Sequence, residues 1–107
     1  MKYQYANQEV KEVSEYLQKY MTKNFISSLT ADQCAELLNS ANLLPNTIGP
    51  KPGFNFREML RQGRDGKINL ISGAKQEKPN ARWSIESNLI IDIALKNMKI
   101  HPTSKKN

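Results

Sequence analysis

The most informative stretch of the chain is residues 56–85, FREMLRQGRDGKINLISGAKQEKPNARWSI. It opens with a short basic pattern in which arginines recur at spacings of four and three residues, as on one face of a helix. The Asp65-Gly66 pair then predicts a tight turn. Two runs of β-forming residues follow, at 67–71 and 81–85. We therefore expect a short helix, a turn and a two-stranded antiparallel hairpin.

The second run of the hairpin alternates polar and apolar side chains. Trp83 and Ile85 fall on one face of the expected strand, and Arg82 and Ser84 fall on the other. A tryptophan could stack on an unpaired base, but in this pattern it is more often a core residue. We predict that Trp83 packs beneath the hairpin.

A segment rich in proline and glycine precedes the basic helix. Residues 45–53, PNTIGPKPG, cannot sustain a helix or a strand, so we expect an irregular loop there. Asn55 is the expected N-cap of the helix, with Glu58 completing a capping box. Gly63 is expected to end it after about two turns.

Two helices are expected before this loop and one after the hairpin. Residues 7–25 carry apolar side chains at helical spacing, with Phe25 as the last. A second helix is expected to start at Thr30, which can form a capping box with Gln33, and to end before Pro45. The final helix is expected over residues 87–98.

Length and charge limit the possible organisation. A chain of 107 residues forms one domain, which we place at residues 1–100, followed by a basic tail at 101–107 that we expect to be disordered. The net charge of +6 is unevenly distributed, because residues 1–50 carry −1 and residues 51–107 carry +7. A one-sided basic field favours a polyanionic partner, nucleic acid above all.

Other classes of function lack the residues they need. One cysteine and one histidine cannot supply a metal site, and the carboxylates form no catalytic motif. No phosphate-binding glycine loop is present. We therefore expect no enzyme activity, no cofactor and no metal. The N-terminal residues MKYQYANQEV lack the apolar stretch of a signal peptide, and no apolar run is long enough to cross a bilayer, so we expect no membrane partner and a cytoplasmic location.

The expected fold is α+β and mainly helical. A pair of helices followed by a two-stranded wing is the winged helix-turn-helix arrangement, here with an extra N-terminal helix and a C-terminal helix. The segments LTADQCAELL, MLRQGRDGKI, SGAK and ARWSIES resemble winged-helix DNA-binding proteins of the excisionase and MerR type, over roughly residues 29–90. The resemblance implies duplex DNA binding without catalysis. The long segment at 42–54 differs from the short turn usual in that family.

The candidate DNA-binding residues are all basic. An arginine on a groove-facing helix can hold a guanine or a phosphate, and wing lysines can hold the backbone. The alternative is a solvated surface, with Arg61 paired to Glu58 or Asp65. The set comprises Arg57, Arg61 and Arg64 on the helix; Lys67, Lys75, Lys78 and Arg82 on or beside the wing; and Lys51 in the preceding loop.

Two classes of function remain open. The first is a small DNA-binding protein that acts as a transcriptional regulator or as an excisionase-like recombination accessory factor. The second is a protein-interaction module that uses the apolar faces of residues 7–25 or 87–98, or self-associates. RNA binding is a third possibility. A DNA reader should gather its basic residues on one surface containing the third helix, whereas an adaptor should expose an apolar groove.

Overall fold

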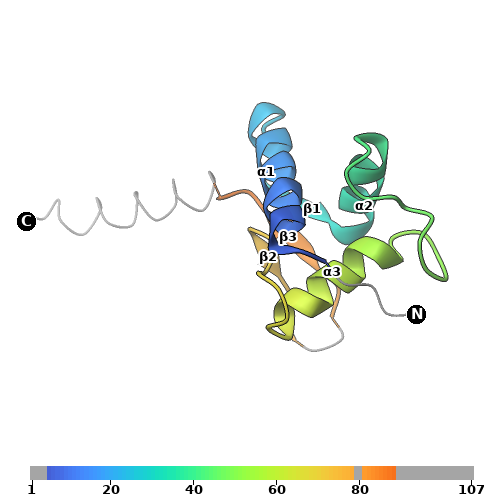
Figure 1. The fold of residues 1–107 in the computed structure, drawn as a ribbon. Helices are drawn as coiled ribbons and strands as arrows, with labels where there is room; N and C mark the ends of the chain where they lie inside the picture. The colour runs from blue at the N-terminus through green and yellow to red at the C-terminus, as the bar shows by residue number, and fades with distance from the viewer. Residues whose placement is uncertain (1–4, 79–80, 89–107) are drawn as a thin grey trace, which may run out of the picture.

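In the part of the chain that the structure describes, three helices surround a small antiparallel sheet (Figure 1). The computed structural model describes residues 5–78 and 81–88, so the tail and all but the first two residues of the expected final helix (87–98) lie outside the described residues. The elements are α1 (Asn7–Lys23), β1 (Ser28–Thr30), α2 (Ala31–Ser40), α3 (Phe54–Arg64), β2 (Ala74–Lys75) and β3 (Ser84–Glu86). The strand order is β1-β3-β2, which places β3 at the centre. The α+β class is therefore confirmed.

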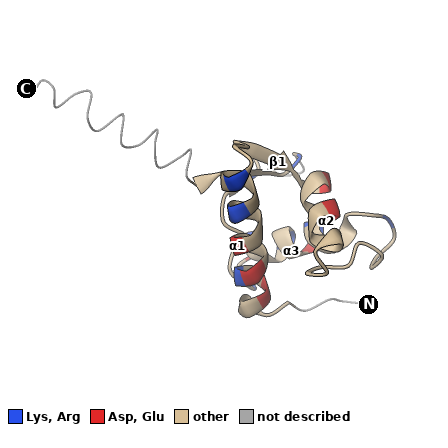
Figure 2. Ribbon diagram, turned by 90° about the horizontal axis from the view of Figure 1, so that it is seen from above, with Lys and Arg blue, Asp and Glu red and all other residues tan. Residues whose placement is uncertain are grey.

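Helix α1 packs its apolar face into the core as expected. Val10, Val13, Leu17 and Met21 are all buried. The expectation for Phe25 was wrong, because the helix ends at Lys23 and the Phe25 side chain is 96% exposed. Figure 2 shows charges of both signs in the first part of α1, whereas the only charged residues in the last two turns are basic, Lys19 and Lys23.

Helix α2 begins with the expected capping box. The Gln33 amide donates to Thr30 Oγ1 at 3.1 Å, and the Thr30 amide donates to Gln33 Oε1 at 2.9 Å. These two bonds satisfy amides that the first turn of a helix otherwise leaves without partners. Cys34 and Leu38 then face the core. This part of the sequence interpretation is confirmed.

Helix α3 differs from its expected bounds at both ends. It starts after Gly53, whose φ of 88° lies in the left-handed region, and it runs for 11 residues. Asn55 is no N-cap: it is buried, its side-chain amide donates to the Pro45 carbonyl at 3.0 Å, and it accepts from the Tyr5 hydroxyl. Gly63 does not end the helix. A methyl group there would lie 2.9 Å from Leu70 Cα, so this glycine permits close packing.

The hairpin is shorter than expected and is displaced along the chain. Residues 67–71 form no strand, although Ile68 and Ile71 bury their side chains from irregular backbone. The strand that pairs with β3 on this side is β2, with Ala74 opposite Ile85. On the other side β3 pairs with β1, a strand that the sequence interpretation missed. The burial of Trp83 is confirmed at 9% exposure.

The loop between α2 and α3 is irregular, as expected, and asparagines hold it in place. Asn39 Oδ1 accepts from the Asn46 amide at 2.9 Å, and Asn46 Oδ1 accepts from the Gly53 amide at 2.6 Å. The contact from Asn55 to Pro45 closes the same loop from its far end. The long connection is therefore tied to both helices and fixes the start of α3.

Within the described ranges, no helix is both long enough and apolar enough to span a membrane.

Candidate nucleic-acid interface

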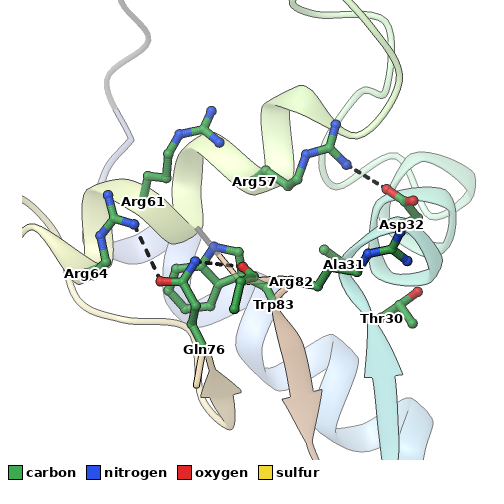
Figure 3. A pocket seen from close by; sticks show the side chains of 10 residues that line it. Thr30, Ala31, Asp32, Arg57, Arg61, Arg64, Gln76, Arg82 and Trp83 are labelled. Atoms are coloured by element: carbon green, nitrogen blue, oxygen red, sulfur yellow. Dashed lines mark hydrogen bonds and ion pairs between the residues drawn. The ribbon is translucent and has the colours of Figure 1, made fainter. Parts of the chain in front are cut away.

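A hollow of about 470 Å³ lies between α3, the start of α2 and the chain leading into β3. Four arginines contribute to its lining, and three of them follow one another along α3 (Figure 3). Its lining residues are Thr30, Ala31, Asp32, Arg57, Arg61, Arg64, Gln76, Ala81, Arg82 and Trp83. The helix face predicted from the arginine spacing and the arginine of the expected wing strand thus meet at one surface.

Arg57 is held at both sides of its guanidinium group. Its Nη1 lies 2.6 Å from Asp32 Oδ1 in the first turn of α2, and its Nη2 donates to the Pro52 carbonyl at 3.2 Å. The side chain is only 23% exposed. Arg57 therefore joins α3 to α2 and to the Pro/Gly loop, which leaves it less free than its neighbours to follow a ligand.

Arg61 is paired within its own helix. Its Nε donates to Glu58 Oε1 at 3.0 Å, and Nη2 lies 2.8 Å from the same oxygen. The guanidinium also sits over the Phe54 ring, 5.3 Å from its centroid. The pairing of Arg61 with Glu58, which was expected if this face were only a solvated surface, is therefore present. Arg61 nevertheless lines the hollow. A phosphate could take the place of the carboxylate because both present two acceptor oxygens.

The carboxyl group of Glu58 has a lowered pKa. Burial alone would raise the pKa, but hydrogen bonds from Gln62 and Arg61 and the positive charges of Arg61 and Lys67 outweigh that effect. Glu58 is therefore ionised at neutral pH and holds Arg61 in a defined position.

Arg64 and Gln76 join the end of α3 to the strand region. Arg64 Nε lies 3.2 Å from Asp65 Oδ1, and Nη1 reaches Gln76 Oε1 at 3.5 Å (Figure 3). Gln76 in turn donates to the Ala81 carbonyl at 2.8 Å. Sequence reasoning missed Gln76 and Asp32, because nothing in the local pattern shows that distant residues will meet these arginines.

Arg82 and Trp83 form the side of the hollow next to β3. Arg82 is exposed and has no ion pair with the residues that the structure describes. The buried Trp83 lines both this hollow and a second hollow. It therefore supports the surface that carries the arginines.

The candidate lysines are more scattered. Lys75 and Lys78 line the second hollow together with Arg64, and Lys75 lies 3.6 Å from Glu86. Lys51 and Lys67 are exposed but line neither hollow. The structure therefore gathers the four arginines, places two lysines beside them, and leaves the other two lysines apart.

No three His, Cys, Asp or Glu side chains in the described part of the chain lie close enough to hold a metal ion. Burial raises the pKa of Cys34 to about 12, so its thiol is protonated at neutral pH.

Comparisons of the chain with protein-family models, with curated proteins and with solved structures found no match.

Proposed function

We propose that this protein binds duplex DNA through the arginine-lined hollow, as a winged helix-turn-helix protein that acts as a regulator or as a recombination accessory factor. In this proposal α3 enters the major groove, and the β2–β3 region, as the wing, contacts the adjoining backbone.

The observation that carries the proposal is the meeting of four arginines on one concave surface. Three come from α3, and Arg82 comes from the segment before β3. A helix pair followed by paired strands is also the element order expected of a winged helix. Guanidinium groups bind phosphate and guanine with paired hydrogen bonds, so such a surface suits a DNA groove and its flanking phosphates.

The contacts of the arginines suggest different roles for them. Arg64 and Arg82 are exposed and can turn toward a phosphate, while Arg61 is oriented by Glu58 and suits a defined partner such as a base edge. Arg57 contributes charge but mainly braces α2 against α3. The lysines of the second hollow, Lys75 and Lys78, are placed to add phosphate contacts.

The protein-interaction alternative is less well supported within the described residues. The apolar face of α1 is used in the core, so it offers no groove to a partner helix. The large apolar side chains exposed there are Phe25 and Leu70, which form no stripe. RNA binding through stacked bases is also less favoured, since Trp83 is buried.

The proposal is tested by fluorescence anisotropy with a labelled duplex at two salt concentrations. Binding should weaken steeply with salt, and Arg64→Ala or Arg82→Ala should reduce the slope of log K against log salt by about 0.9 for each phosphate that the variant no longer neutralises. Lys11→Ala removes an exposed charge on α1, outside the hollow, and should change the slope far less. Failure of the wild-type protein to bind any duplex at low salt rejects the proposal.

Base reading by Arg61 is tested separately. Arg61→Ala should weaken binding to a preferred site by about 1–3 kcal/mol more than binding to random DNA. Lys75→Ala and Lys78→Ala should weaken both equally, because a lysine on the wing meets only phosphate. Equal losses for Arg61→Ala on both DNAs would assign Arg61 to the phosphates instead.

A further inference from the structure

The outward face of α1 carries a regular stripe of side chains that the proposed DNA surface does not use. Its residues recur at alternating spacings of three and four, which places them in one row along the helix. The stripe consists of Glu9, Glu12, Tyr16, Lys19 and Lys23. The four charged members are exposed, and Tyr16 is half-buried at the middle, stacked on Tyr20 with 6.4 Å between ring centroids.

The charges of this stripe are separated by sign along the helix. Both acids precede Tyr16 in the sequence, and both lysines follow it. No ion pair with the described residues involves Glu12, Lys19 or Lys23. A neighbouring helix that runs in the opposite direction and carries the same sequence would meet every one of these charges with its opposite.

We propose that the stripe is the interface of a homodimer in which two copies of α1 pack antiparallel about a two-fold axis near Tyr16. Glu9 and Lys23 are equally far from Tyr16 in the sequence, and Glu12 and Lys19 are nearly so. The axis therefore brings Glu9 beside Lys23 of the second copy and Glu12 beside its Lys19, while the two Tyr16 rings meet. Such an interface is isologous, since the same patch serves both chains.

The strained residue at the end of α1 is consistent with this arrangement. Phe25 has a φ of 56° and is 96% exposed, an unfavourable state for an aromatic side chain. In the antiparallel pair, Phe25 of one chain lies beside the first turn of the other α1, near Asn7. The second copy thus offers a contact for a ring that otherwise faces solvent.

The dimer leaves the DNA surface free. The stripe belongs to α1 alone, whereas the hollow is lined by α2, α3 and the strand region, and no residue is shared. A single pair of short helices buries little surface, so the association is weak and sensitive to salt. The inference does not depend on DNA binding.

Charge reversal with rescue tests the dimer by sedimentation equilibrium of the full chain at low salt. Wild-type protein should show a weight-average mass that rises with concentration toward that of two chains. Lys19→Glu alone and Glu12→Lys alone each place like charges across the axis and should weaken association about tenfold. Mixing the two variants restores opposite charges at both contacts and should restore the wild-type association.

Matched controls separate the interface from net charge. Lys11→Glu alters charge as Lys19→Glu does, and Glu36→Lys alters it as Glu12→Lys does, at exposed sites off the stripe. Both controls should associate like the wild type. A monomeric wild type, an association that both reversals leave unchanged, or a mixture that fails to recover would each overturn the proposal.

Discussion

Replacing Phe25 with glycine should make the folded protein more stable, although it removes a large apolar side chain. The α1 helix ends in a Schellman motif: the Ile26 amide donates to the Met21 carbonyl at 2.8 Å, and the Phe25 amide donates to the Thr22 carbonyl at 3.4 Å. That motif requires a left-handed residue at the position of Phe25, where glycine is usual. Here an aromatic residue occupies it with a φ of 56°.

The expected gain follows from three contributions. Relief of the left-handed conformation stabilises the fold by about 1–2 kcal/mol. The greater freedom of glycine in the unfolded chain offsets about 0.5–1 kcal/mol of this. Little burial is removed, because the ring is 96% exposed. The net gain is about 1 kcal/mol, or roughly 4–8 °C in Tm for a domain of this size.

Thermal unfolding followed by circular dichroism, at a concentration low enough to avoid self-association, is the assay. A control comes from α2, which ends in the same motif with Asn42 at a φ of 59°. Asparagine tolerates this conformation, so Asn42→Gly should raise the Tm less than Phe25→Gly. A lower Tm for Phe25→Gly would instead mean that the ring makes contacts on which the fold depends.

Trp83→Ala should lower the free energy of unfolding by about 3–5 kcal/mol, because the ring is 9% exposed in the core; an unchanged melting point together with abolished DNA binding would instead make it a contact residue. The wild type should have a higher free energy of unfolding than Glu58→Gln above about pH 4.5, and this difference should disappear as the pH falls through the lowered pKa of Glu58. A difference that persists in strong acid would contradict this role of the Glu58 carboxylate. Cys34, with its pKa raised to about 12, should resist thiol reagents at pH 8 until the protein unfolds; rapid labelling of native protein, detected by mass, would show that the thiol is accessible.

The sequence predicted the elements whose signals are local. The capping box of Thr30 and Gln33 depends on residues three apart, and the apolar face of α1 depends on helical spacing. Both could therefore be predicted from the local sequence. The start of α3 was not, because the left-handed Gly53 replaces Asn55 as its cap. Asn55 is instead buried and hydrogen-bonded to Tyr5, which is distant in the sequence, and to Pro45, which lies at the other end of the loop.

Strand pairing and the detail of the site depended on contacts between distant segments. β1 is only three residues long, Ser28–Thr30, with one buried residue, Leu29, so its alternation is too short to predict a strand, yet β3 pairs with it. The apolar residues of 67–71 looked like a strand but fill the core from irregular backbone. Arginine spacing predicted the common face of α3, whereas the engagement of Arg57 by Asp32 required the fold of α2 against α3.

An NMR titration of the full chain with duplex DNA at low salt, in which backbone amide shifts locate the contact surface, tests directly whether the arginine-lined hollow binds DNA. The proposal predicts the largest changes at Arg61, Arg64, Gln76 and Arg82, around the hollow, with small changes along the α1 stripe. Changes that centre on α1, or none at a DNA concentration well above that of the protein, would contradict the assignment of the arginine-lined hollow as the DNA-binding surface.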